Sequence, residues 1–185
     1  MTRIIGLSGS LRKASINAGL LRAAKDVTPA GAELEIETIR GIPLYDGDEE
    51  AAHGLPAAVT ALKEKIAAAD GLLLVTPEYN NAMPGVFKNA LDWLTRPASD
   101  VKRVFGGKSV GLIGATPSGW GTLLSQASWL PVLRHIGAQH WSGGRLALSK
   151  GGDLFDSEGN LKDEASRGQL KTYMEGFVAF LGSKS

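Results

Sequence analysis

The chain has 185 residues, 43% of them hydrophobic, and no cysteine. A chain of this length can bury roughly 70% of its unfolded surface, so we expect one domain over residues 1–185. Lys and Arg number 20 against 19 Asp and Glu, a formal charge of +1 that argues against an electrostatic nucleic-acid binder. Because cysteine is absent, disulfides, thiolate metal sites and CxxC redox chemistry are excluded, and any redox function requires a bound cofactor.

Hydrophobic periodicity predicts five strands that alternate with five helices. In chain order we expect a strand at 3–8, a helix at 16–27, a strand at 33–37, a helix at 55–66, a strand at 71–75, a helix at 84–94, a strand at 110–115, a helix at 123–130, a strand within 140–148 and a helix at 170–181. This alternation is typical of a parallel sheet covered on both faces. It suits an α/β, flavodoxin-like, doubly wound domain with a five-stranded parallel sheet.

Several connections complete this outline. Residues 43–50 are expected to form an acidic loop, residues 96–109 a polar connection and residues 150–160 a turn-rich excursion. Proline lacks the N–H that an interior helical position needs, so Pro131 is expected to bend or interrupt the fourth helix. A strand is expected to begin within three residues of the first, which leaves no signal peptide. No apolar run approaches the ~20 residues of a membrane helix, and a cytoplasmic location without a membrane partner is expected.

The stretch at residues 76–85 follows the continuous apolar run at 71–75, which is typical of a strand buried on both faces. Pro77 ends that strand, since proline has no N–H for a ladder and holds the preceding residue extended. Ligands of open α/β sheets bind at the carboxyl ends of strands. Turn formation alone accounts for asparagine and glycine here but not for Glu78 and Tyr79, so we expect a ligand-facing loop.

The first strand is followed by Ser10, Arg12, Lys13, Ser15 and Asn17 at the start of a helix. Free N–H groups and the positive end of the helix dipole attract a phosphate at such a place. Hydroxyl, amide and guanidinium donors would add hydrogen bonds to it. The alternative interpretation is a simple helix cap made by Ser15.

The sequence gives little support for other phosphate-binding loops, for a metal site or for a catalytic nucleophile. The first loop lacks G-x-G-x-x-G, and Gly106-Gly107-Lys108-Ser109 resembles only the end of a Walker A loop. The three histidines are scattered without metal-ligand spacing, so no metal site is expected. There is no G-x-S-x-G nucleophile motif. Trp120, set between glycines, is interpreted as a lid over a cofactor or substrate or as an oligomer contact.

Two motifs together resemble those of the NADPH-dependent FMN reductase family, which includes bacterial chromate/quinone reductases and azoreductases. Gly9 to Asn17 matches G-S-x-R-x-x-S-x-N in full, and the P-E-Y-N, P-G and K-N-A-x-D-W elements are matched at 77–80, 84–85 and 88–93. The similarity covers nearly the whole chain, including Pro43-Leu44-Tyr45-Asp46. Residues 116–121 depart from the pattern, keeping only a hydroxyl and glycines.

The resemblance implies an enzyme that binds FMN and uses NADPH or NADH as co-substrate. Hydride would pass to flavin N5 and then to a small-molecule electron acceptor, and no side chain need act as acid or base. The implied cofactor-binding residues are Ser10, Arg12, Ser15 and Asn17 for the phosphate, Pro77, Glu78, Tyr79 and Asn80 for the isoalloxazine, and Ser118 and Gly119 from the neighbouring loop. The resemblance also implies a homodimer or homotetramer.

Two other classes stay open: a flavodoxin-like one-electron carrier without NAD(P)H oxidase activity, and a regulatory or structural domain without cofactor. A carrier that docks on basic partners is usually strongly acidic, whereas this chain is near neutral and offers Arg12, Lys13 and Arg96 as accessible cations. These features favour the reductase. The sequence leaves open the acceptor (quinone, chromate, azo dye, ferric chelate or free flavin), the choice between NADH and NADPH, and the oligomer size.

Overall fold

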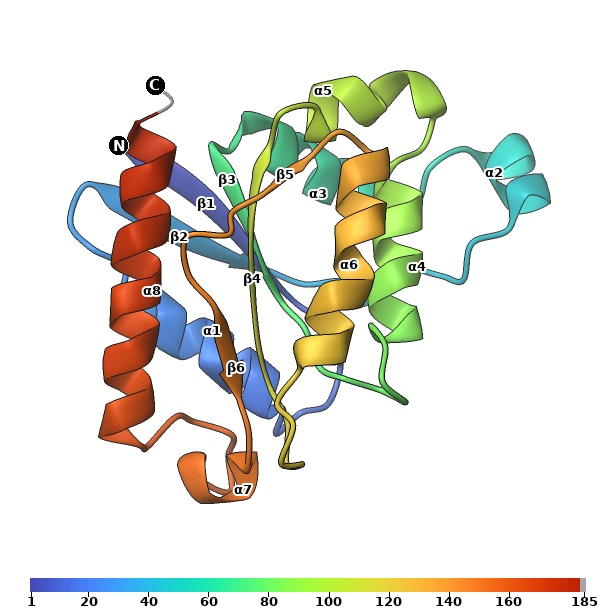
Figure 1. The fold of residues 1–185 in the computed structure, drawn as a ribbon. Coiled ribbons are helices and arrows are strands. Elements are labelled where there is room, and N and C mark those ends of the chain that lie inside the picture. The colour runs from blue at the N-terminus through green and yellow to red at the C-terminus, as the bar shows by residue number, and fades with distance from the viewer. Residues whose placement is uncertain (184–185) are drawn as a thin grey trace.

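A parallel sheet with helices on both faces organises residues 1–183, the part of the chain that the computed structural model describes (Figure 1). The strands are β1 Thr2–Ser8, β2 Ala32–Glu37, β3 Gly71–Val75, β4 Ser109–Ala115, β5 Gln139–His140 and β6 Leu146–Leu148. Their order is β2-β1-β3-β4-β5, and β6 also pairs with β4. This 2-1-3-4-5 order is that of the flavodoxin-like doubly wound fold, which confirms the predicted fold class.

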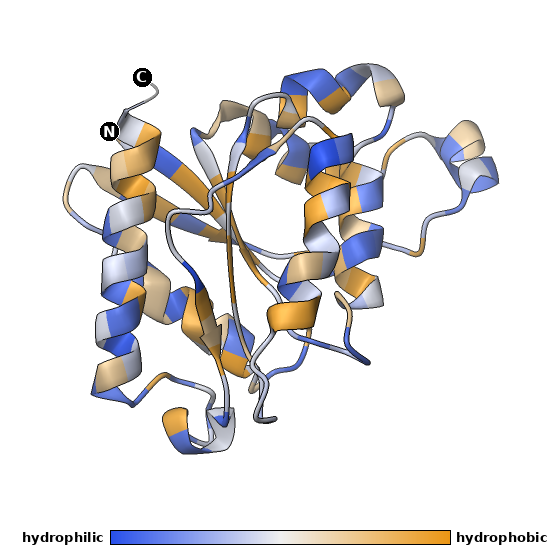
Figure 2. Cartoon of the chain, in the orientation of Figure 1, coloured by the Kyte–Doolittle hydropathy of each residue, from blue (hydrophilic) through white to orange (hydrophobic). Residues whose placement is uncertain are grey.

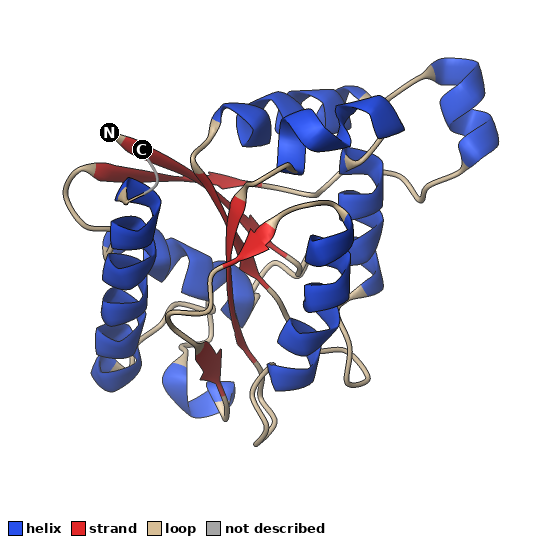
Figure 3. Cartoon of the chain, turned by 45° about the horizontal axis from the view of Figure 1, so that its top comes forward, coloured by secondary structure: helices blue, strands red, loops and turns tan. Residues whose placement is uncertain are grey.

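Two layers of helices cover the sheet, as Figure 3 shows from a second direction. One layer contains α1 (Ile16–Asp26) and α8 (Glu164–Gly182), and the other contains α3 (Ala57–Ala68), α4 (Gly85–Leu94), α5 (Val101–Phe105) and α6 (Leu123–His135). The connections carry α2 (Gly47–His53), α7 (Gly151–Leu154) and a 3₁₀ turn at Ala98–Asp100.

The central strands are rich in apolar residues (Figure 2). Their side chains belong to the buried clusters of both layers. In β3, Leu72 and Leu74 pack toward α3 and α4, while Leu73 and Val75 pack toward α1 and α8. All five residues of β3 are buried, because successive side chains of a strand point to opposite faces and both faces are covered. The sheet therefore places β3 at the centre of the strand order, and the loop that follows it begins at the carboxyl edge of the sheet.

Three local expectations were wrong. Residues 47–53 form α2 instead of an acidic loop, because Asp46 caps it by accepting from the Asp48 N–H at 2.9 Å. Residues 101–105 of the predicted polar connection form α5, which buries Val104 and Phe105. The excursion at 150–160 is rich in turns as expected, and it also contains the single helical turn of α7. The single fifth strand is two pieces, β5 and β6, each paired with a different part of β4.

Pro131 lies inside α6, which continues to His135 without interruption. The N–H that proline lacks would have bonded the carbonyl of Ala127. Both Ala127 and Pro131 are exposed residues. Water can therefore satisfy that carbonyl, and the cost of proline in the helix is reduced. No helix within residues 1–183 has the length and apolar character needed to span a membrane.

Candidate functional site

The loops that follow β1, β3 and β4 meet around one cavity of about 200 Å³. It is lined by Ser10, Arg12, Ala14, Ser15, Ile16, Asn17, Pro77, Glu78, Tyr79, Ala115, Thr116, Pro117 and Gly152. Seven of the ten residues that the sequence singles out are in this lining, and Asn80, Ser118 and Gly119 are not. The cavity lies at the carboxyl ends of the strands, where open α/β sheets bind their ligands.

The first loop is held in place by its own polar side chains. Ser15 caps α1, and its Oγ accepts from the Ala18 N–H at 3.2 Å. Asn17 is buried and hydrogen-bonded to the backbone of Ala115 at the end of β4. Gly9 allows the loop to approach the next one, because a Cβ there would lie 2.3 Å from the ring of Phe87 and 2.9 Å from Pro77.

The electrostatics of this end of the cavity favour an anion. The first turn of α1 contains no acidic residue, so its N–H groups and helix dipole are not neutralised there. Arg12 is exposed and forms no ion pair within the described residues. The hydroxyls of Ser10 and Ser15 supply two further donors. These groups fit a terminal phosphate.

The second loop is locked to α6. Thr76 is fully buried, its Oγ1 lies 2.8 Å from the Ser125 Oγ, and the Trp129 Nε1–H donates to it at 3.1 Å. The Oε2 of Glu78 accepts from the N–H groups of Leu124 at 2.9 Å and Ser125 at 3.0 Å. Glu78 therefore caps the start of α6, and its negative charge is directed at that helix end.

The remainder of the second loop is a tight turn. Tyr79 and Ala82 exchange two backbone hydrogen bonds at 3.0 and 3.1 Å across Asn80 and Asn81. Both asparagines have positive φ, 51° and 62°, as the centre of a type I′ turn requires. Asn80 is exposed and Tyr79 is 46% exposed beside the cavity. The turn-forming interpretation therefore explains the backbone of the asparagines, while Tyr79 faces the site.

The third loop contributes different residues from those expected. Thr116 and Pro117 line the cavity, whereas Ser118 and Gly119 follow them outside the lining. The Ser118 Oγ lies 3.2 Å from the Thr116 Oγ1, and the Ser118 carbonyl accepts from the Lys150 N–H at 2.9 Å. This second bond brings the α7 segment, with Gly152, to the cavity. Sequence analysis missed Gly152, since no motif marks the 150–160 segment.

A second cavity of about 480 Å³ adjoins the first through Glu78 and is lined by Glu78, Asn81, Trp120, Leu123 and Leu124. Trp120 is 81% exposed, and the two leucines are also exposed. The neighbouring cavity therefore offers an open aromatic and apolar surface next to the polar one.

Two further expectations concern charge. Within residues 1–183 no group of three or more His, Asp or Glu could hold a metal ion. Arg96 is not an accessible cation of this site, because its Nε donates to Glu50 at 2.8 Å and it lies outside both cavities. Arg12 and Lys13 lie in the first loop, and Arg40 donates to the Leu11 carbonyl of that loop at 2.6 Å.

The 2-1-3-4-5 strand order, with a cavity at the carboxyl edge of the sheet, defines a flavodoxin-like α/β protein. The family model of NADPH-dependent FMN reductases matches residues 2–153, and the chain belongs to this family. The matched range contains the positions of both motifs and of the ten predicted site residues.

Relatives agree with this assignment. An NAD(P)H-dependent FMN reductase of Pseudomonas aeruginosa is 36% identical over 94% of this chain and 91% of its own length. A 2-hydroxy-1,4-benzoquinone reductase of a Burkholderia species is 35% identical over 97% of this chain and 96% of its own. The solved structure of FerB, an NAD(P)H:(acceptor) oxidoreductase from Paracoccus denitrificans, superposes with a TM-score of 0.86 at 30% identity and covers 99% of this chain and 98% of that one.

The chain is therefore an NAD(P)H-dependent oxidoreductase with FMN as its cofactor. These relatives favour the reductase over the one-electron carrier that the sequence left open.

Proposed function

We propose that this protein is an NAD(P)H:quinone reductase that binds FMN in the three-loop cavity and its acceptor in the adjoining apolar cavity. The observation that carries the proposal is the convergence of the loops after β1, β3 and β4 on a cavity with a cationic, hydroxyl-lined end. When bound, FMN would supply the redox chemistry: it would accept a hydride equivalent from NAD(P)H and pass reducing equivalents on to the acceptor.

At the phosphate end, Ser10 and Ser15 donate hydroxyl hydrogens and Arg12 contributes a charge-assisted pair. Asn17 has one Nδ2 hydrogen beyond its two bonds to Ala115, and it can donate that hydrogen to the phosphate. The main role of Asn17 is to position the first loop, because its bonds to Ala115 hold the end of β4 against the start of α1.

At the ring end, Pro77, Glu78 and Tyr79 form the wall of the cavity. Glu78 orients this wall through α6, and its carboxylate does not act as an acid or base in the proposal. Asn80, Ser118 and Gly119 are assigned to the rim, next in sequence to residues of the lining. Backbone N–H groups of these loops would stabilise negative charge on the reduced ring.

The acceptor is assigned to the cavity of Trp120, Leu123 and Leu124 because a planar quinone buries apolar area against such side chains. Chromate, a small dianion, gains nothing from an aromatic wall and is the weaker candidate. Azo dyes, ferric chelates and free flavin are further acceptors to be compared.

The proposal also covers the setting of the enzyme. A single reductase domain spans residues 1–185, of which 184 and 185 lie outside the described part. It works in the cytoplasm, where NAD(P)H is held reduced, as a homodimer or homotetramer. Exposed Val86 on α4 and Leu130 on α6 give apolar surface for such assembly.

The purified protein tests the proposal directly. Heat-released flavin is identified by chromatography, and anaerobic NADH or NADPH oxidation is then measured with 1,4-naphthoquinone, chromate and free FMN. We expect FMN, ping-pong kinetics and the highest kcat/KM with the quinone. FAD in place of FMN, or flavin reduction without turnover on any quinone, would overturn it.

A further inference from the structure

The last strand of the sheet is interrupted beside α6. Its first piece, β5, pairs with the start of β4, and its second piece, β6, pairs with the end, so that Gly111 and Leu112 of β4 face the break. The connection at 141–145 crosses the break outside any strand. The Leu112 carbonyl accepts from the side-chain hydroxyl of Tyr173 on α8, at 3.1 Å.

Trp141 holds this connection on the α8 side of the sheet. Its ring centroid lies 4.9 Å from that of Tyr173 and 5.5 Å from that of Phe177. Gly143 and Gly144 lie against the same ring, because a Cβ at these positions would come within 2.6 and 2.8 Å of it. The connection is therefore drawn toward α8, and the α6 side of the break stays open.

The open side contains a cavity of about 360 Å³ between α6 and the break. Leu112 and Leu123 give it apolar walls, and His140, Ser142 and Arg145 lie together in its lining. Leu123 also lines the cavity of Trp120 and Leu124, to which the acceptor is assigned. The two cavities are therefore neighbours that share one leucine as a wall.

Gln126 fixes the width of the new cavity. It is buried in the lining, where its Nε2 donates to the Leu146 carbonyl of β6 at 2.9 Å and to the Thr122 Oγ1 at 3.0 Å. These bonds join α6 to β6 across the cavity floor. The polar groups on the far side of the break are thus held at a constant distance from α6.

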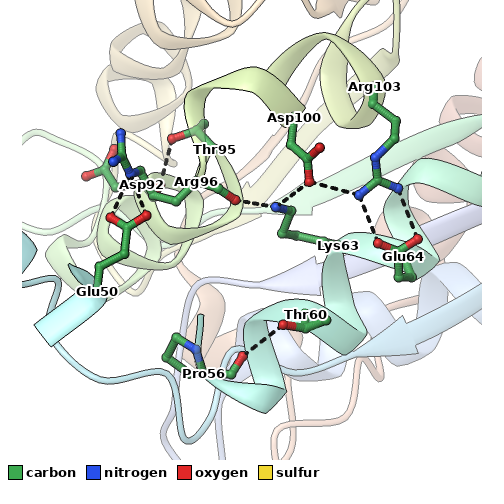
Figure 4. A network of polar contacts seen from close by, with 10 residues as sticks. All are labelled: Glu50, Pro56, Thr60, Lys63, Glu64, Asp92, Thr95, Arg96, Asp100 and Arg103. Atoms are coloured by element: carbon green, nitrogen blue, oxygen red, sulfur yellow. Dashed lines mark hydrogen bonds and ion pairs between the residues drawn. The ribbon is translucent and has the colours of Figure 1, made fainter. Parts of the chain in front are cut away.

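Arg145 is a cation without a counter-charge. Two other arginines have carboxylate partners, Arg96 with Glu50 and Arg103 with Glu64, in the network of Figure 4. Arg145 forms no ion pair within residues 1–183, and no Asp or Glu lines its cavity. A guanidinium beside a hydroxyl and an imidazole is suited to a carboxylate, which it binds by charge-assisted hydrogen bonds.

We propose that the preferred acceptor is a quinone that carries an acidic side chain. Its ring lies in the cavity of Trp120 and Leu124, its chain passes Leu123, and its carboxylate binds Arg145 with help from Ser142. This inference rests on the proposed function, because the ring site is the one assigned there to a quinone. The carboxylate takes no part in the reduction and supplies binding alone.

The charge of Glu78 does not oppose such a ligand. Although Glu78 lines the ring cavity, its carboxylate accepts from the N–H groups of Leu124 and Ser125 and is directed at the start of α6. One guanidinium also matches one carboxylate, whereas a dinucleotide would bring a pyrophosphate. The site is therefore assigned to the acceptor and not to NAD(P)H.

A series of 1,4-naphthoquinones with carboxyalkyl chains of increasing length tests the inference, with the neutral methyl ester of each acid as its matched control. The chain has no cysteine to which a quinone could add. Binding to the oxidised holoprotein is measured by equilibrium dialysis without NAD(P)H, and kcat and KM are then measured with it. We expect the acid to bind at least tenfold more tightly than its ester at an intermediate chain length, with a similar kcat.

Replacement of the cation identifies the group responsible. Arg145→Gln should remove the preference for the acid and leave binding of the ester unchanged, while Arg145→Lys should keep part of the preference. Arg134→Gln, an exposed arginine of α6 outside both cavities, is the matched control and should keep all of it. Gln169→Ala should also keep it, since Gln169 lies in the cavity of about 450 Å³ on the α8 side of Arg145.

Equal binding of acid and ester at every chain length would overturn the inference, as would a preference that survives Arg145→Gln or is lost in Gln169→Ala. A higher KM for NAD(P)H in Arg145→Gln, with the acid preference intact, would overturn it in favour of the dinucleotide. Tight, Arg145-dependent binding of the acid without turnover of any quinone would count against the proposed function alone. Turnover of acid and ester with the same KM would count against the acidic side chain alone.

Discussion

The side-chain amide of Asn17 pairs with both backbone groups of Ala115, a residue 98 positions away. Its Nδ2 donates to the Ala115 carbonyl at 2.8 Å, and its Oδ1 accepts from the Ala115 N–H at 2.9 Å. The pair imitates one rung of a β-ladder and continues β4 onto the first turn of α1. An asparagine expected to bind phosphate thus also joins two of the three loops of the site.

Replacing Asn17 should therefore reduce stability as well as cofactor binding. Asn17→Ala leaves the buried N–H and carbonyl of Ala115 without their partners, and each unpaired group costs about 1–3 kcal/mol. We expect the free energy of unfolding of the apoprotein, measured in urea, to fall by at least that amount. Ser10→Ala, a control in the same loop, should lower FMN affinity but leave apoprotein stability within about 0.5 kcal/mol. Equal stability of the two variants would contradict the prediction.

Ser15→Asp separates helix capping from phosphate binding. Aspartate caps a helix as well as serine does, so the bond to the Ala18 N–H is kept and apoprotein stability should change little. The new charge repels a phosphate and the hydroxyl donor is lost, which at about 1.5–3 kcal/mol means at least a tenfold loss of FMN affinity. The measurement is fluorescence titration with FMN. Unchanged FMN affinity would show that Ser15 acts only as the N-cap of α1.

Glu78 is expected to act through α6. Glu78→Ala removes the acceptor of two N–H groups in the first helical turn and should cost about 0.5–2 kcal/mol in thermal or urea unfolding. Glu78→Gln keeps a carbonyl acceptor and loses only the interaction with the helix dipole, about 0.3–1 kcal/mol. The two variants are compared as apoproteins. If Glu78→Gln lowers the stability of the apoprotein as much as Glu78→Ala does, the charge of Glu78 and not its hydrogen bonds holds the loop.

Asp100 should give the protein an acid-sensitive step. Hydrogen bonds from Arg103 and Lys63 lower the pKa of its carboxyl to about 2, below the ordinary value of about 3.9. As the pH falls, the unfolded chain takes up the proton first, so the stabilisation is complete above about pH 4 and is lost toward pH 2. Asp100→Asn should flatten the unfolding free energy over this window, whereas Glu33→Gln, without an ion pair, should not. A slope that survives in Asp100→Asn would place the acid sensitivity elsewhere.

A test of the Asn80 side chain needs a substitution that can adopt the left-handed backbone conformation of this turn. Alanine at a φ of 51° carries a left-handed penalty of about 1–2 kcal/mol, whereas glycine adopts this conformation readily. Asn80→Gly should therefore keep the melting temperature while raising the KM for NAD(P)H or acceptor, or lowering kcat. Normal turnover in this variant would assign Asn80 to turn formation alone.

Much of the fold was predictable because the responsible signals are local. The unbroken apolar run of β3 and the alternating glutamates of β2 indicated a central and an edge strand, and both assignments are confirmed. The position of the segment that carries α2 could not be predicted, because it depends on bonds from Asn89 and Arg96, which are far away in sequence. The split of the last strand likewise depends on which part of β4 each piece can reach.

The site could be predicted where a motif of polar residues directly follows a strand, because the strand then fixes where the motif lies. The loops of Ser15 and Pro77 were located because polar residues follow apolar strands directly. Gly152 was missed because a backbone bond between Ser118 and Lys150 brings it to the cavity, and no residue pattern marks such a bond. The capping role of Glu78 was missed for a similar reason, since its partners are backbone N–H groups.

The two margins of the sheet differ, yet both resist the addition of a foreign strand. On one margin, β2 carries Glu33, Glu35 and Glu37 at every second position, and a like strand laid beside it would bring carboxylates together. On the other, β5 and β6 offer only two and three residues with a break between them. Short or charged margins are how proteins avoid edge-to-edge aggregation. The interrupted last strand thus protects the chain against fibril-like pairing at high concentration.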